Sequence, residues 1–142
     1  MLLPNNREGL RALYIEAWRK RRERLPAEPL EVQVADVIEQ HPEYQPLLEQ
    51  GDAALQRDWT PEDGESNPFL HMGLHLALRE QVATDRPAGI AGLHRALAGR
   101  LGLHEAEHRM AECLAEELWR AQRDGVLPDE AGYLDALRRL AR

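Results

Sequence analysis

Apolar residues recur every three or four positions through most of the chain, which is the period of an amphipathic helix. The clearest example is the stripe formed by Leu10, Leu13, Tyr14, Ala17 and Trp18. It predicts a helix over residues 6–24. No segment shows the strict alternation of a half-buried strand. The pattern therefore favours an all-helical protein.

Proline, glycine and asparagine divide the helical pattern into segments. Pro26 and Pro29 end the first one, and Pro42 ends the next near His41, because the residue before a proline is pushed out of the α region. Gly102 is placed to end one helix and Gly125 another. The predicted helices cover residues 6–24, 29–40, 68–84, 88–101, 103–124 and 129–141, with a further short helical turn between 42 and 48.

The middle of the chain, residues 51–66, is acidic and rich in turn-forming residues. Residues 60–68 are expected to form an ordered loop and not a flexible linker. Asn67 then serves as the N-cap of the next helix, and Pro68 occupies its first turn.

These segments predict an all-α, single-domain helical bundle of about five to six helices over residues 1–142. Short connections favour antiparallel neighbours. Tyr14, Trp18 and Trp119 are expected to pack in the core, and Cys113 is expected to be a buried, unreactive thiol.

The charge of the chain narrows its choice of partners. The net charge of −7 argues against a dedicated nucleic-acid binder, which needs clustered cations. The exception is residues 19–24, interpreted as a solvated helix end or, alternatively, a contact for an anionic partner. No apolar run approaches the roughly 20 residues that span a membrane, and no signal peptide is evident. With one cysteine, a cytoplasmic location is expected.

Two histidine pairs carry the candidate chemistry. His71 and His75 stand near the start of one predicted helix, and His104 and His108 near the start of another. Residues four apart share a helix face, so each pair can direct two imidazoles at one point. Glu112, four residues after His108, adds a carboxylate to the second face.

Imidazole and carboxylate ligands on facing helices suit a transition-metal ion such as zinc or iron. The predicted ligands are His71, His75, His108 and Glu112, with His41 and His104 as possible extras. One ion can join His75 and His108 only if their side chains lie within about 8 Å. Two alternatives remain: a hydrogen-bonded polar cluster without metal, and scattered surface histidines.

Four blocks of the sequence resemble an uncharacterised family of small proteobacterial proteins, known only as a domain of unknown function. The blocks are residues 17–20 (AWRK), 41–44 (HPEY), 60–71 (TPEDG with NPFLH) and 112–123 (ECL with LWRAQR). The resemblance covers nearly the whole chain. It implies a bacterial, cytoplasmic, single-domain protein and no particular activity. Members of the family it resembles often carry a second histidine where this chain has Gln45, a departure that puts position 45 in doubt as part of any shared site.

Two functions therefore compete. One is a metal-binding bundle, with hydrolytic or redox activity as its possible chemistry. The other is a non-catalytic interaction module in which the histidines are structural and a protein partner docks on the basic helix end or an apolar face.

Overall fold

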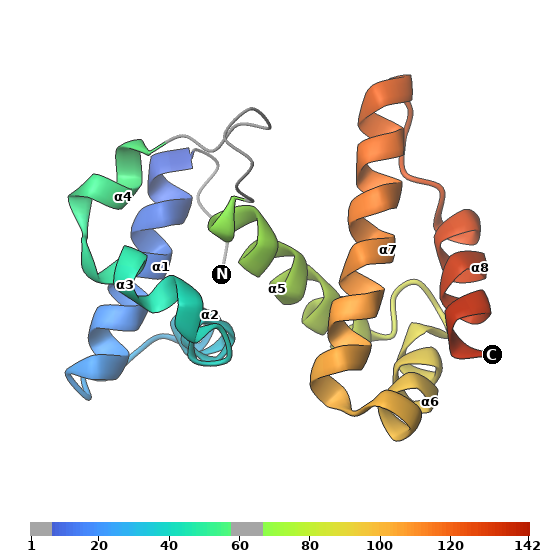
Figure 1. Ribbon diagram of the computed structural model, residues 1–142, viewed down its shortest axis with the longest axis horizontal. Coiled ribbons are helices and arrows are strands. Elements are labelled where there is room, and N and C mark those ends of the chain that lie inside the picture. The colour runs from blue at the N-terminus through green and yellow to red at the C-terminus, as the bar shows by residue number, and fades with distance from the viewer. Residues whose placement is uncertain (1–6, 58–66) are drawn as a thin grey trace. The chain divides into compact units, whose positions relative to one another are not determined.

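The computed structural model describes residues 7–57 and 67–142, and within these two ranges the secondary structure is helical. The helices are α1 (Arg7–Arg22), α2 (Pro29–Glu39), α3 (Gln45–Glu49), α4 (Asp52–Gln56), α5 (Pro68–Thr84), α6 (Ile90–Leu101), α7 (Leu103–Asp124) and α8 (Glu130–Ala141), with a 3₁₀ turn η1 at Pro42–Tyr44 (Figure 1). The chain forms two compact units, residues 1–72 and 73–142.

In the first unit, α1 packs against α2, α3 and α4 (Figure 1). The core side chains of the unit include Tyr14, Ala17, Trp18, Val34, Val37, Ile38 and Leu48. Their spacing on α1 and α2 is the apolar period that the sequence shows. α2 starts where the Glu31 carboxylate accepts the backbone N–H of Glu28 at 2.8 Å, and it ends just before His41.

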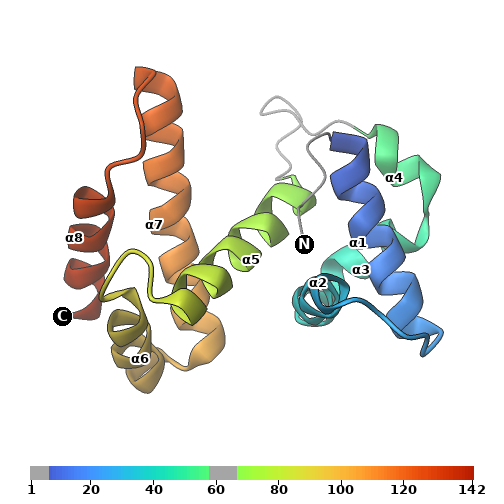
Figure 2. The same cartoon turned by 180° about the vertical axis from the view of Figure 1, so that it is seen from behind.

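In the second unit, α6 packs against both α7 and α8, and α7 lies beside α8 (Figures 1 and 2). Its core consists of Leu78, Ile90, Leu97, Ala106, Met110, Leu114, Tyr133 and Leu137. Gly125 ends α7 with φ of 66°, a left-handed conformation that glycine adopts without steric cost.

Helix α5 belongs to both units: its residues up to Met72 are in the first unit and those from Gly73 on are in the second. At its start, the side chain of Asn67 accepts the backbone N–H groups of Phe69 and Leu70 at 2.9 and 3.3 Å, so the predicted N-cap is confirmed. The ring of Phe69 packs against Tyr14 of the first unit, with the centroids 5.7 Å apart. Leu78, further along, is buried in the core of the second unit.

The six longer predicted helices are confirmed within two residues at each end. The short helical turn predicted between 42 and 48 is confirmed by η1 and α3. With α3 and α4 counted, the described ranges contain more helices than the predicted five to six. α4 lies within the segment predicted to be turn-rich. The predicted ordered loop at 60–68 falls almost entirely outside the described residues.

The core prediction is correct for Tyr14 and Trp18, which are 6% and 7% exposed, and wrong for Trp119, which is 62% exposed. Trp119 lies on the outer side of α7, where the guanidinium of Arg123 stacks over its ring at 4.7 Å. Cys113 is half-buried, and burial raises the pKa of its thiol, which fits an unreactive cysteine.

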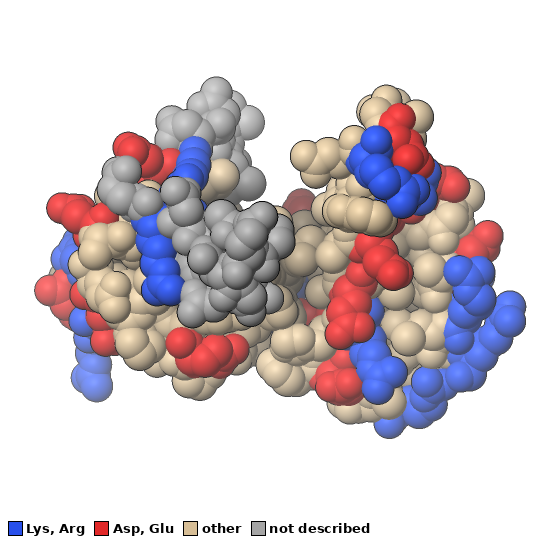
Figure 3. All heavy atoms as spheres, turned by 45° about the horizontal axis from the view of Figure 1, so that its top comes forward, with Lys and Arg blue, Asp and Glu red and all other residues tan. Residues whose placement is uncertain are grey.

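The basic end of α1 is neutralised by neighbouring carboxylates. Arg19 pairs with Glu16 and Glu23, Lys20 with Glu31, Arg21 with Asp36 and Glu39, and Arg22 with Glu49. In Figure 3, acidic and basic side chains lie next to each other over much of the described surface in view, and basic side chains gather along its right-hand edge. These ion pairs favour a solvated helix end over a contact for an anionic partner.

Among the described helices, none is long and apolar enough to cross a membrane.

Candidate metal centre

His75, in the second unit, is held in a defined orientation. It lies on α5, one turn before the core residue Leu78, and its side chain is fully buried. Its Nδ1 is 2.5 Å from Oε1 of Glu107 on α7. A buried imidazole is stable only when its polar atoms are satisfied, and this contact meets that requirement at Nδ1.

Glu107 is in turn held by Arg79, which also comes from α5. The Nε of Arg79 donates to both carboxylate oxygens at 3.1 Å. Burial on its own would raise the pKa of Glu107, but its hydrogen bonds with His75 and Arg79 and the positive charge of Arg79 outweigh burial and lower that pKa to about 2. Glu107 is therefore a carboxylate at neutral pH.

The side chains of His75 and His108 lie within the limit of about 8 Å that a shared ion requires. Their ring centroids are 4.7 Å apart in an edge-to-face arrangement, and each ring offers a nitrogen within 4.8 Å of one on the other. Two nitrogens bound to one ion lie roughly 3–4 Å apart, so a small side-chain movement would bring both onto a metal. His104 contacts His108, with centroids at 4.5 Å, but is itself exposed.

In the first unit, His41 and His71 form a second pair. His41 follows α2, is 1% exposed, and donates from Nδ1 to the carbonyl oxygen of Val37 at 2.8 Å. Its ring meets that of His71 edge-on, with centroids 5.2 Å apart. Tyr44 contacts both rings, stacking on His41 at 5.6 Å and meeting His71 at 5.9 Å.

His71 and His75 are four residues apart within α5, which is helical from Pro68 to Thr84. Side chains at this spacing lie one above the other on the same helix face. The predicted arrangement of this pair on one face therefore follows from the helix itself.

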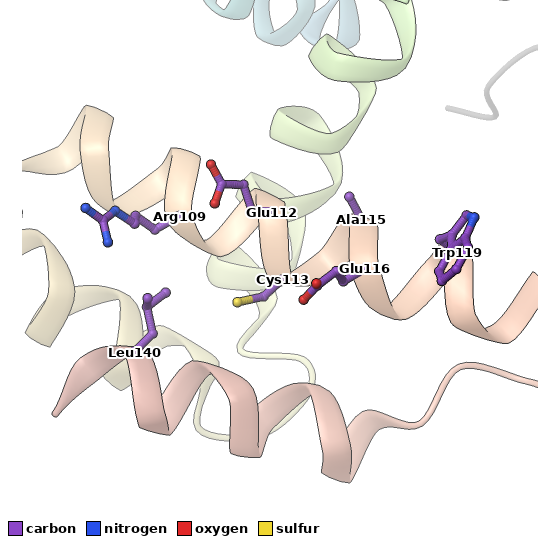
Figure 4. A pocket seen from close by; sticks show the side chains of 7 residues that line it. All are labelled: Arg109, Glu112, Cys113, Ala115, Glu116, Trp119 and Leu140. Carbon is purple, nitrogen blue, oxygen red and sulfur yellow. The ribbon is translucent and has the colours of Figure 1, made fainter. Parts of the chain in front are cut away.

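Glu112 lies elsewhere on α7. It is exposed and lines a surface pocket of about 530 Å³ together with Arg109, Cys113, Ala115, Glu116, Trp119 and Leu140 (Figure 4). This pocket opens beside α8. The described contacts of His75 and His108 are with Glu107, with His104 and with each other, and none of them involves Glu112.

The sequence interpretation missed Glu107, Arg79 and Tyr44. Glu107 stands at the head of the stripe formed by Met110, Ala111 and Leu114, which are buried. A carboxylate in line with a core stripe is a signal that could have identified it. Arg79 carries a second signal, because it is four residues after His75 and shares its face.

Both pairs have the features of nitrogen ligands for a transition metal. The carbonyl of Val37 and the carboxylate of Glu107 can only accept a hydrogen bond, so His41 and His75 each carry a proton on Nδ1. In the neutral form of each ring, Nε2 then carries the lone pair that a metal ligand requires. A histidine that binds a metal through one ring nitrogen nearly always donates a hydrogen bond from its other ring nitrogen to a carboxylate, a carbonyl or water.

A family model matches residues 6–139 of the chain. The chain belongs to the DUF1841 family, a domain of unknown function. The match agrees with the resemblance seen in the sequence and includes every histidine of both pairs. No curated protein and no solved structure matches this DUF1841 chain.

Proposed function

We propose that this protein binds a transition-metal ion through histidines carried by α5 and by the segments that contact it. The proposed ligands are His75 and His108 in the second unit and His71 in the first, where His41 is a further ligand. Glu112 and His104 are left out, because Glu112 lines a different pocket and His104 is exposed.

One observation carries the proposal: two buried histidines each have Nδ1 bonded to an acceptor and each contact a second histidine. A core histidine with only a structural role needs one or two hydrogen-bond partners and no second imidazole. The contacts of His75 with His108 and of His41 with His71 place additional nitrogen donors beside these rings. Neutral imidazole suits zinc, iron, copper and nickel.

The test is elemental analysis of the purified protein after exposure to zinc and removal of loosely bound ions. We expect about one ion per chain. His75→Ala and His108→Ala should each lower the metal content several-fold. Circular dichroism checks that the variants remain helical. His108→Ala is less disruptive to folding than His75→Ala, because the side chain of His108 is only partly buried.

His94→Ala is the matched control. It removes a partly buried histidine of α6, and its metal content should equal that of the unaltered protein. A protein that holds no metal and keeps its helices in the presence of a chelator would contradict the proposal. That result is what the competing hypothesis, a non-catalytic interaction module with structural histidines, predicts.

A further inference from the structure

We propose that Glu107, itself held by Arg79, is a positioning residue that fixes His75 as the Nδ1–H tautomer and so leaves Nε2 as its ligand atom. The ligand role of Nε2 rests on the proposed metal binding. The tautomer does not, and it can be measured without any metal.

The first step of the inference is the bond between His75 and Glu107. Nδ1 of His75 and Oε1 of Glu107 are 2.5 Å apart, which is within hydrogen-bond distance. The imidazole is fully buried, so water does not compete for Nδ1. An ionised carboxylate has no proton to donate, and the proton of the bond therefore lies on Nδ1.

The second step is the restraint on Glu107. A carboxylate that could rotate would not fix a ring, but Arg79 contacts both of its oxygens through Nε at 3.1 Å and one through Nη2 at 3.0 Å. His75 and Arg79 are one turn apart on α5, so a single carboxylate on α7 bonds two successive turns of the other helix. This arrangement leaves Glu107 little freedom.

The third step compares the two buried histidines. Nδ1 of His41 donates to a neutral carbonyl, whereas Nδ1 of His75 donates to a carboxylate. A negatively charged acceptor increases the electron density of the ring and makes Nε2 the stronger donor to a metal. Among the proposed ligands, His75 is therefore the one whose contribution to affinity depends most on a neighbouring side chain.

The tautomer is tested by nitrogen NMR of metal-free protein labelled with ¹⁵N-histidine, at about pH 8, above the range in which histidine in short peptides titrates. In the unaltered protein we expect His75 to show a protonated Nδ1 and an unprotonated Nε2. Glu107→Ala should replace this single form by a mixture of tautomers. A protonated Nε2 in the unaltered protein, or a Glu107→Ala variant that keeps the single form, would overturn the inference.

The effect on the metal is tested by zinc competition with a chromophoric chelator. Glu107→Gln keeps the shape of the side chain and removes its charge, and it should weaken zinc binding about 10- to 100-fold. Glu105→Gln is the control, because Glu105 is on the same helix and pairs with Arg109 at 2.9 Å, yet is exposed. It should leave zinc affinity unchanged.

The outcomes separate this inference from the proposed function. Equal zinc affinity in Glu107→Gln and the unaltered protein would overturn the effect of the Glu107 charge on the ligand strength of His75 while metal binding stands. A protein that binds no zinc but shows the expected tautomer, lost in Glu107→Ala, would refute metal binding and leave the positioning of His75 by Glu107 established.

Discussion

Burial divides the histidines of this chain into groups that sequence spacing alone does not separate. His41 and His75 are almost completely buried, His71, His94 and His108 are partly buried, and His104 is exposed. A buried imidazole must be stabilised by specific contacts, whereas an exposed one is stabilised by water. The rings of His41 and His75 therefore depend on hydrogen bonds and ring contacts from other residues of the protein.

The tryptophans give a prediction at the residue scale. Trp18 is 7% exposed and its indole N–H donates to Glu49 at 3.3 Å, whereas Trp119 is 62% exposed. Trp18→Ala should lower the free energy of unfolding by about 3–5 kcal/mol, because it leaves a cavity. Trp119→Ala should lower it by at most about 1 kcal/mol, the value of an exposed cation–π contact. Urea titrations followed by circular dichroism measure both, and similar losses would contradict this assignment.

Sequence spacing predicted part of the candidate site. It singled out the histidines, because they lie near helix starts beside apolar stripes, but it left open whether His75 and His108 are neighbours. It selected Glu112 instead of Glu107, since four-residue spacing from His108 was the criterion. The buried stripe of α7 includes Met110 and Leu114, and it is in line with Glu107. Which face of α7 meets α5 is decided by tertiary packing, and a single helical pattern does not contain that information.

At the scale of elements, periodicity predicted the long helices well and the short ones poorly. An apolar stripe needs at least two turns before its period can be recognised. α3 and α4 have five residues each, little more than one turn. They are stabilised by their packing on α1 and not by a pattern of their own.

The start of α2 gives a prediction at the scale of elements. The Glu31 carboxylate accepts from the backbone N–H of Glu28 and from Nζ of Lys20 on α1, each at 2.8 Å. The ion pair with Lys20, followed by the backbone hydrogen bond, holds the pKa of Glu31 below its usual value. Glu31→Gln removes the charge from both contacts and should lower the free energy of unfolding at pH 7 by about 1 kcal/mol.

The pH dependence of this effect has a definite sign. A carboxyl whose pKa is lowered on folding stabilises the protein above its unfolded value, near 4.3, and this contribution is lost as the pH falls through the folded pKa. The difference between Glu31→Gln and the unaltered protein should therefore shrink as urea titrations are repeated from pH 7 towards pH 3. Glu39→Gln, on the exposed side of the same helix, is the control and should change stability by less than about 0.5 kcal/mol. A difference that stays constant with pH would show that the charge of Glu31 is not the cause.

At the scale of the whole molecule, the chain has two sets of buried apolar residues, one in each compact unit. The expectation of one domain over residues 1–142 came from chain length and the lack of a visible linker. Helix α5 explains why no linker is visible, because the division between the units falls between Met72 and Gly73, inside a continuous helix. A boundary of this kind leaves no change of composition in the sequence.

Metal binding should also be measurable as stability of the whole chain. A ligand that binds only the folded protein raises the free energy of unfolding by about 2.7 kcal/mol when its free concentration is 100 times its dissociation constant. Zinc should therefore raise the melting temperature of the unaltered protein, and a chelator should reverse the rise. His108→Ala should show little of this shift and His94→Ala all of it. An equal shift in His108→Ala would mean that zinc stabilises the protein from another position, because His108 contributes the second imidazole beside His75.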